Sequence, residues 1–221
     1  MRMRWSEKDC GWLAGELAAV REGVRPTTLA KVERRRDAFR LLVACVISLR
    51  TKDEVTAQAS ARLFAVAATP ETLSRLAERR IAKLIFPAGF YNTKAKQIRE
   101  IARRIARDHG GRVPADREAL LGFAGVGRKT ANLVLGLGFG IPAICVDTHV
   151  HRISNRLGLV RTRKPEETER TLEKVLPQRL WIDINDLLVT FGQNICQPVS
   201  PWCSRCPLAE RCPRVGVGRY R

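Results

Sequence analysis

The feature that most limits the fold is a short glycine-rich turn between two helical segments. Residues 116–132 read Asp-Arg-Glu-Ala-Leu-Leu-Gly-Phe-Ala-Gly-Val-Gly-Arg-Lys-Thr-Ala-Asn, which predicts a helix over 116–123, a tight hairpin and a second helix from Arg128. Gly125 and Gly127 permit a positive φ and the close approach of another backbone. The first amides of the second helix have no intrahelical partner, so the turn offers a site for a phosphate group.

Two other interpretations of this turn remain open. It could be an ordinary turn between helices without a ligand, or a degenerate nucleotide-binding loop, because Gly-Arg-Lys-Thr partly matches Gly-Lys-Ser/Thr. That loop needs a lysine directly after the last glycine and a buried strand before it. Here Arg128 intervenes and the preceding segment is an amphipathic helix. These differences disfavour a nucleotide hydrolase.

Helical patterns extend along most of the chain. Asp37 can cap a helix that runs to about Ser48 and turns its apolar side inward: Phe39, Leu42, Val43, Val46 and Ile47. Further helices are predicted over 52–67, from Pro70, and over 92–108, 128–139, 148–157, 165–176 and 180–194. In 92–108 we expect the basic residues to project away from the apolar face: Lys94, Lys96, Arg99, Arg103 and Arg107. The strand-like run 143–146 is too short for a sheet, so the sequence predicts an all-α fold.

The charge of the chain points to a polyanionic partner. Its 221 residues include 40 Lys and Arg against 22 Asp and Glu, a formal net charge of +18. Such a surplus is typical of proteins that bind nucleic acid, although a charged surface kept for solubility would look the same. No stretch approaches the ~20 apolar residues of a membrane span, and no secretory signal follows the charged start. We therefore expect a cytoplasmic protein in a reducing environment, without a membrane partner.

Four of the seven cysteines lie close together near the C-terminus: Cys196, Cys203, Cys206 and Cys212. In a reducing compartment such a group indicates a metal site rather than disulfides. From the spacing alone, zinc and a [4Fe–4S] cluster both remain possible, although zinc sites more often pair two Cys-x2-Cys hooks. The other three, Cys10, Cys45 and Cys145, have apolar neighbours, and we expect buried thiols there.

These motifs together resemble the endonuclease III family of helix-hairpin-helix DNA glycosylases. The resemblance rests on Leu-x-Gly-Phe-x-Gly-Val-Gly-Arg-Lys-Thr-Ala-Asn, on the run Val-Asp-Thr-His-Val at 146–150 and on the cysteine spacing. Ala124 departs from the proline usual in the family. The resemblance implies two all-α domains with a DNA cleft between them and a [4Fe–4S] cluster on the four cysteines. One domain would be a six-helix barrel with the hairpin over 26–141; the other would combine 1–25 with 142–221 and carry the iron–sulfur loop at 196–212.

The resemblance also implies an activity. The chain would be a monomeric, bifunctional DNA glycosylase and AP lyase that removes oxidised or ring-saturated pyrimidines from damaged double-stranded DNA. Lys129 would be the nucleophile that forms a Schiff base at C1′ of the deoxyribose, leading to β-elimination. Asp147 would be the essential carboxylate, although by its position it could simply cap the next helix. A monofunctional glycosylase is disfavoured, because such relatives lack a lysine at position 129.

Further residues match segments that contact DNA in the family. Arg50 would fill the space left by the extruded base, and Phe90 or Tyr91 would wedge the opposite strand. Well-known members have Gln in place of Arg50, so a plain phosphate contact is an equal alternative there. With Ala124, this departure also leaves open a lesion-binding protein with little catalysis. The complete set of expected DNA contacts is Gly125, Val126, Gly127, Arg128, Arg50, Phe90, Tyr91, Asn92 and Arg205.

Overall fold

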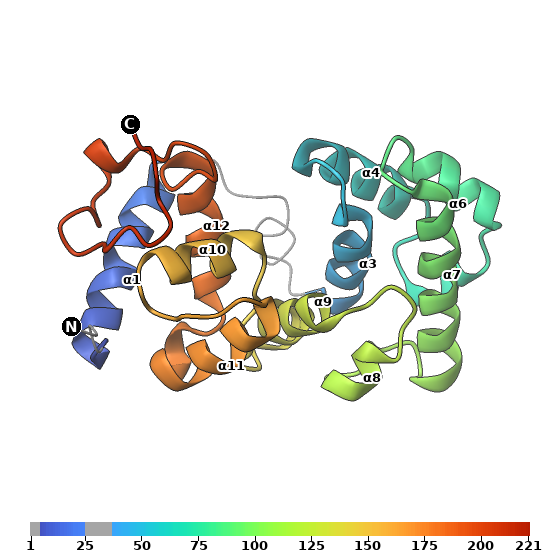
Figure 1. The fold of residues 1–221 in the computed structure, drawn as a ribbon. Coiled ribbons are helices and arrows are strands. Elements are labelled where there is room, and N and C mark those ends of the chain that lie inside the picture. Colours follow the sequence, from blue (N-terminus) through green and yellow to red (C-terminus); the bar gives the residue numbers. More distant parts are fainter. Residues whose placement is uncertain (1–4, 25–36) are drawn as a thin grey trace. The chain divides into compact units, whose positions relative to one another are not determined.

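The computed structural model describes residues 5–24 and 37–221, which form helices and turns and contain no strand (Figure 1). The predicted all-α class is confirmed. The chain divides into two compact units: the hairpin unit, Thr27–Ile141, and the terminal unit, which combines Met1–Pro26 with Pro142–Arg221. The boundary expected near Pro26 lies outside the described residues. None of the described helices is long and apolar enough to cross a membrane.

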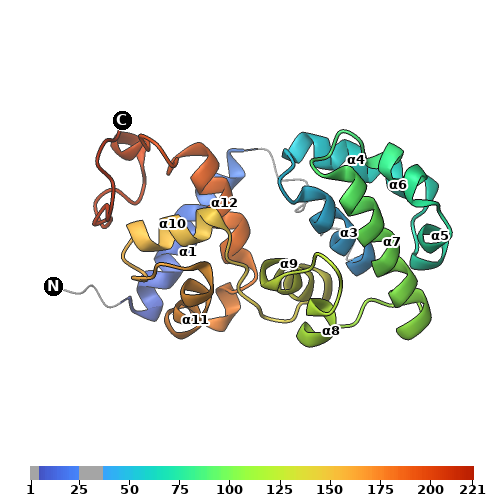
Figure 2. The same ribbon diagram turned by 45° about the vertical axis from the view of Figure 1, so that its right-hand side comes forward.

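The hairpin unit is built around one long helix. Its elements are α3 (Ala38–Ser48), α4 (Asp53–Val66), α5 (Pro70–Ser74), α6 (Glu78–Ile85), α7 (Tyr91–Asp108), α8 (Arg117–Leu121) and α9 (Arg128–Leu133). Helices α3, α5 and α6 pack against α7, as Figure 2 shows. Asp37 caps α3 through a hydrogen bond from the amide of Arg40 at 3.0 Å, and Thr69 caps α5 just before Pro70. Apolar side chains of α3 and α7 fill the core, among them Leu42, Val46, Ile98 and Ile101.

Four details of this unit differ from the sequence-based expectations. Lys94 does not project outward but is buried, with 3% of its surface exposed. Gly127 has a negative φ of −99°, so only Gly125 of the two hairpin glycines has a positive φ. The helix predicted over 128–139 is α-helical only to Leu133 and continues as a π-helical turn, η1 (Val134–Gly138). Helix α6 was not predicted.

The terminal unit packs its helices on α12. Its elements are α1 (Glu7–Glu22), α10 (Thr148–Arg156), α11 (Pro165–Val175) and α12 (Asp183–Asn194), with short 3-10 turns at Gln178–Leu180 and Cys203–Arg205. Helices α1 and α10 both pack against α12, and the core includes Leu13, Leu17, Ile153, Leu188 and Phe191. The loop after α12, drawn in red in Figure 1, carries the four clustered cysteines.

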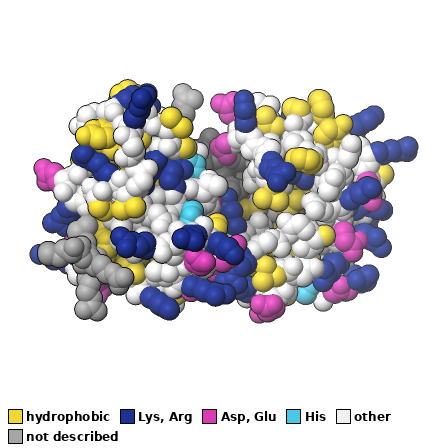
Figure 3. Space-filling model, viewed as in Figure 1, with side chains coloured by type: hydrophobic (Ala, Val, Ile, Leu, Met, Phe, Trp, Pro, Cys, Tyr) yellow, Lys and Arg dark blue, Asp and Glu magenta, His cyan; other side chains and the backbone are white. Residues whose placement is uncertain are grey.

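Basic side chains are distributed over both units. In the face shown in Figure 3, Lys and Arg occur over most of the surface, and Asp and Glu are sparser. This distribution agrees with the formal net charge of +18. A positively charged surface attracts a polyanion from solution, whereas specific placement has to come from particular sites.

Candidate functional site

In the hairpin, Gly125 and Val126 pack against the rest of the unit, whereas Gly127 is exposed. Gly125 has a φ of +80°, and a Cβ there would lie 2.7 Å from Nε2 of Gln97 on α7. The side chain of Val126 is buried and anchors the turn. Gly127 is the N-cap of α9, and apart from its two chain neighbours no described residue has an atom within 4 Å of where its Cβ would stand. The residue directly before the first amides of α9 therefore has open space on its Cβ side within the described chain.

Lys129 is the second residue of α9, and its side chain is exposed. The next residues of the helix, Thr130 and Ala131, are buried, which fixes the helix and leaves Lys129 on its outer side. The positive charge of Lys129 interacts electrostatically with the thiol of Cys45 on α3. Burial raises the pKa of Cys45 to about 12, and Lys129 offsets part of that shift. Cys45 is therefore protonated at neutral pH and does not compete with Lys129 as a nucleophile.

Asp147 is held by the start of α10 in the terminal unit. A buried stretch without regular secondary structure, residues 144–146, leads to it. Its Oδ1 atom accepts hydrogen bonds from the amides of His149 at 2.8 Å and Val150 at 2.9 Å, so the predicted N-cap is confirmed. Two amides on one carboxylate oxygen fix the orientation of the carboxylate. Lys129 belongs to the hairpin unit and Asp147 to the terminal unit.

The structure brings Arg50 and Phe90 together, and we call this pair the insertion tip. Both residues have left-handed backbones, with φ of +52° for Arg50 and +56° for Phe90. Both side chains are exposed, and the guanidinium of Arg50 lies 5.6 Å from the centre of the Phe90 ring. Tyr91 begins α7 and packs its ring edge-on against Phe86 at 5.3 Å, and Asn92 beside it is exposed. A left-handed backbone is costly outside glycine and concentrates at functional sites.

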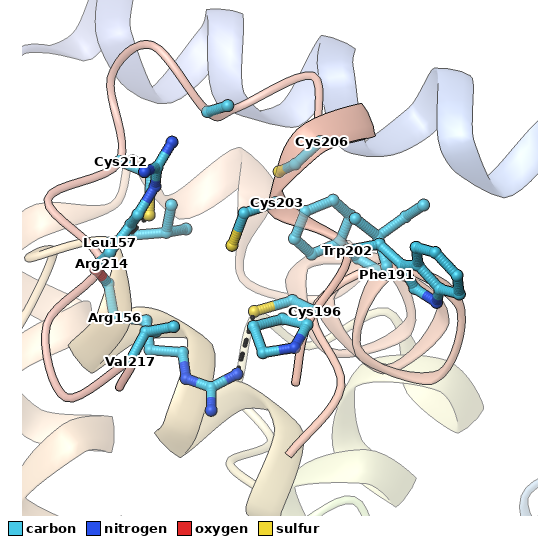
Figure 4. Close-up of a pocket in the computed structure, with 13 residues that line it drawn as sticks. Arg156, Leu157, Phe191, Cys196, Trp202, Cys203, Cys206, Cys212, Arg214 and Val217 are labelled. Atoms are coloured by element: carbon cyan, nitrogen blue, oxygen red, sulfur yellow. Dashed lines mark hydrogen bonds between the residues drawn. The ribbon is translucent and has the colours of Figure 1, made fainter. Parts of the chain in front are cut away.

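The four clustered cysteines surround one pocket in the terminal unit (Figure 4). Its empty space is about 390 Å³, part of it open to solvent. Apolar side chains complete the lining, among them Leu157, Phe191, Ile195 and Val217. Across residues 5–24 and 37–221, no three His, Cys, Asp or Glu side chains converge on one point as ligands of a single metal ion. None of the four cysteines is in a disulfide bond.

Burial dominates the electrostatics of three of the thiols, Cys203, Cys206 and Cys212. It raises the pKa of Cys206 to about 11 and raises the pKa values of Cys203 and Cys212 as well. A free thiol at these positions therefore stays uncharged at neutral pH. The expected DNA contact Arg205 lies within this loop, between Cys203 and Cys206; it is exposed, and its guanidinium lies 4.2 Å from the centre of the Trp202 ring.

Two arginines of α10 contact the first cysteine of the loop, and the sequence analysis did not predict either contact. Arg156 is buried, and its Nη1 atom donates to the sulfur of Cys196 at 3.4 Å (Figure 4). Arg152 donates from Nη2 to the carbonyl oxygen of Cys196 at 2.8 Å, and its burial lowers its pKa. Their spacing of four residues, which places both on one face of α10, was the available signal in the sequence.

Comparison with known proteins identifies the family. The model for HhH-GPD superfamily base excision DNA repair proteins matches residues 43–178. This chain belongs to the HhH-GPD superfamily. Endonuclease III from Thermotoga maritima is 50% identical over 188 residues, covering 84% of this chain and 88% of that protein. Endonuclease III from Bacillus subtilis is 39% identical over 175 residues, covering 79% and 80%. The resemblance to endonuclease III is thus confirmed.

Solved structures agree with this HhH-GPD assignment. A trapped covalent intermediate of an endonuclease III with DNA superposes with a TM-score of 0.76 at 37% identity, over 80% of this chain and 84% of that one. A thermostable thymine-DNA glycosylase superposes with a TM-score of 0.80 at 28% identity, over 92% and 94%. The chain spans about half the length of a longer relative, the chloroplastic endonuclease III homolog 2 of Arabidopsis thaliana, of which it covers 48%. The chain is therefore an HhH-GPD enzyme.

Proposed function

We propose that this chain is a bifunctional DNA glycosylase and AP lyase that removes oxidised or ring-saturated pyrimidines from double-stranded DNA. The observation that carries the proposal is an exposed lysine in the first turn of the helix after the hairpin. A relative at 37% identity is described as a trapped covalent intermediate with DNA, and such trapping requires a nucleophilic protein group. The relatives named endonuclease III support the same activity.

In this proposal Lys129 supplies the nucleophile. Its neutral amine attacks C1′ of the deoxyribose, the bond from C1′ to the damaged base breaks, and the base leaves with the bonding electrons. Loss of a proton from nitrogen and opening of the sugar ring give the Schiff base. Removal of a proton from C2′ then expels the 3′ phosphate by β-elimination, and water releases the enzyme.

Asp147 supplies a negative charge and a proton acceptor. Its carboxylate would accept a proton from the incoming amine and stabilise the positive charge that develops on the sugar as the base departs. The two amides on Oδ1 support this role, because they keep the carboxylate in one orientation through the reaction. Capping and catalysis are therefore compatible.

DNA would be held at three places, and the enzyme would act as a monomer. Backbone amides of the hairpin at Gly125 to Arg128 would bind a phosphate, supported by the open space at Gly127. Arg50 and Phe90 would enter the duplex, with Tyr91 and Asn92 at the same end of α7. Arg205 would contact the backbone from the cysteine loop. The bacterial relatives favour a cytoplasmic location on chromosomal DNA.

A [4Fe–4S] cluster is the proposed occupant of the cysteine pocket. Four cysteine thiolates are the donor set that such clusters use, and the four side chains surround a cavity rather than a single point. When bound, the cluster would cross-link the loop and maintain its shape. We expect purified protein to be brown and to contain iron. A colourless protein that carries zinc and takes up no iron on anaerobic reconstitution would contradict this assignment.

Borohydride trapping on duplexes that contain thymine glycol or an abasic site tests the activity. The wild-type protein should cleave the strand and, with sodium borohydride present, form a covalent complex with DNA. Lys129→Gln should abolish trapping, and Lys83→Gln, an exposed lysine on α6, should leave it unchanged. Trapping by Lys129→Gln would place the nucleophile elsewhere. Tight binding by wild type without cleavage or trapping would favour a lesion-binding protein.

A further inference from the structure

Lys94 is the one lysine classed as buried among the described residues, and it makes contacts to one segment of chain. Its ammonium donates to the carbonyl oxygens of Ile47 at 2.6 Å and Leu49 at 2.5 Å, and to the hydroxyl of Thr51 at 2.8 Å. These carbonyls lie at the C-terminal end of α3, where carbonyls lack intrahelical donors and a positive charge is favoured. The lysine thus binds the turn on both sides of Arg50.

Lys94 is also tied to the other half of the insertion tip. Its own amide donates to the carbonyl oxygen of Phe90 at 3.0 Å, one helical turn earlier. One residue therefore contacts the chain next to Arg50 through its side chain and Phe90 through its backbone. Removal of the side chain would break only the first of these two connections.

A hydroxyl and a close backbone contact complete the link between the two turns. Thr51 Oγ1 donates to the carbonyl of Leu49 at 3.2 Å and accepts from Lys94 and from the amide of Gly89 at 3.1 Å. Its one donor and two acceptor positions are all used. A Cβ on Gly89 would lie 2.6 Å from the carbonyl oxygen of Arg50. The turn before α7 therefore rests directly on the turn after α3.

The insertion tip depends on this arrangement because its own side chains are not packed. Arg50 and Phe90 have positive φ, a conformation that costs free energy and persists only where the surrounding structure holds it. Phe90 is 64% exposed, so burial of its ring does not supply that hold. The hydrogen bonds of Lys94 to the residues on either side of Arg50 therefore hold the backbone of the tip in place.

A lysine at this position costs free energy, because its charged ammonium is removed from water. Burial lowers its pKa to about 8, and its side-chain partners are two carbonyls and a hydroxyl, none of which carries a charge. An apolar residue of the same length would fill the space without desolvating a cation. A cation that bridges three oxygen atoms gives a defined geometry that an apolar side chain does not.

We infer that Lys94 is a positioning residue for DNA insertion: it holds Arg50 and Phe90 in the arrangement that enters the duplex. This inference rests on the proposed role of the insertion tip. It assigns to Lys94 no contact with the substrate. Loss of its ammonium should let the turn at Arg50 relax, so that insertion is impaired while the Schiff-base chemistry of Lys129 remains available.

A fluorescent base opposite an abasic site measures insertion directly. With 2-aminopurine at that position, insertion unstacks the base and raises its fluorescence, and a Lys129→Gln background prevents cleavage. Lys94→Met and Arg50→Ala should each lose most of the fluorescence rise at saturating protein. Lys96→Met, an exposed neighbour on the same helix, should keep it. If Arg50→Ala loses the rise and Lys94→Met keeps it, the inference is wrong and the tip assignment stands; if both keep it, the tip assignment is itself wrong.

A double-mutant cycle on the active enzyme separates positioning from a general loss of structure. Lys94→Met and Arg50→Ala should each lower kcat/KM on duplex substrate about tenfold or more, the scale of one lost charge-assisted hydrogen bond. If Lys94 acts through Arg50, the double variant should be no worse than Arg50→Ala alone; multiplied losses would overturn the inference. Circular dichroism checks the fold of Lys94→Met. Should that variant be unfolded, Thr51→Val takes its place in both experiments with the same expected results.

Discussion

Arg156 and Cys196, forty residues apart in the sequence, are joined by a hydrogen bond of 3.4 Å from a guanidinium nitrogen to the cysteine sulfur. The same guanidinium donates to the carbonyl oxygens of Gln197 at 2.7 Å and Pro198 at 2.8 Å. One buried cation thus binds three successive residues at the start of the cysteine loop. Because Arg156 ends the helix that Asp147 begins, the loop and the candidate carboxylate are attached to the same rigid element, α10.

Replacement of Arg156 by Met should loosen the cysteine loop. The carbonyls of Gln197 and Pro198 lose a charged donor in two partly buried hydrogen bonds, so we expect a loss of about 3 kcal/mol in the free energy of unfolding. The sulfur of Cys196 also loses a donor that stabilises negative charge, so the proposed cluster should have a lower reduction potential. Urea unfolding and voltammetry of the iron-loaded protein measure the two effects. Arg161→Met, at an exposed position after α10, is the control; equal behaviour of the two variants would contradict this role.

Capping and catalysis by Asp147 can be separated with two substitutions. Asn caps a helix about as well as Asp, so Asp147→Asn should change the free energy of unfolding by less than about 0.5 kcal/mol. It removes the carboxylate charge, so single-turnover base release should slow by about 100-fold or more. Asp147→Ala should lose about 1 kcal/mol of stability in addition. Binding to DNA with an uncleavable abasic analogue should persist in the Asn variant. If base release stayed at the wild-type rate in the Asn variant and slowed only in the Ala variant, capping would be the main role of Asp147.

The sequence predicted those parts of the fold that local signals determine. Asp37, Thr69 and Asp147 are side-chain caps, and the helices after them begin where expected. Helix α6 was missed because Ala77 at its N-cap supplies no side-chain hydrogen bond. The π-helical turn at 134–138 was missed for a different reason. Its last residue, Gly138, packs against Ala38 at the start of α3, where a Cβ would be 3.1 Å from that of Ala38, and a local pattern does not report this contact.

The candidate site shows the same division between local and distant information. The spacing of the four cysteines identified the pocket, because they share one loop. The contacts of Arg156 could not be predicted from a local pattern, because its partners lie about forty residues later in the chain. Lys94 was assigned to the outer side of its helix because lysine is usually solvated. Its burial is explained by carbonyls at the end of another helix, which no pattern within α7 contains.

The stability contribution of Lys94 should depend on pH in a defined direction. Its pKa is about 8 in the folded protein, below the ordinary value of 10.5, so between these values the unfolded chain binds more protons. The free energy of unfolding should therefore rise with pH across this window. Relative to Lys94→Met, wild type should gain about 2 kcal/mol from pH 7.5 to 9.5, measured by urea unfolding at constant salt. A constant or falling difference would mean that Lys94 is not desolvated.

The two hairpin glycines should respond differently to alanine. Gly125→Ala places a Cβ on a backbone with φ of +80° and against Gln97, so it should cost about 1–2 kcal/mol in the free energy of unfolding. Gly127 has a negative φ and open space around its Cβ position, so Gly127→Ala should change stability by less than about 0.5 kcal/mol.

Binding distinguishes the functional interpretation of Gly127 from a purely structural one. A methyl group at position 127 would stand in front of the first amides of α9, where the proposed phosphate contact lies. Gly127→Ala should therefore raise the Kd for duplex DNA about tenfold at fixed salt, with the fold intact. Fluorescence anisotropy on an uncleavable duplex measures this change. Wild-type affinity in a folded Gly127→Ala variant would show that no phosphate approaches the turn, and that the hairpin serves only to join α8 and α9.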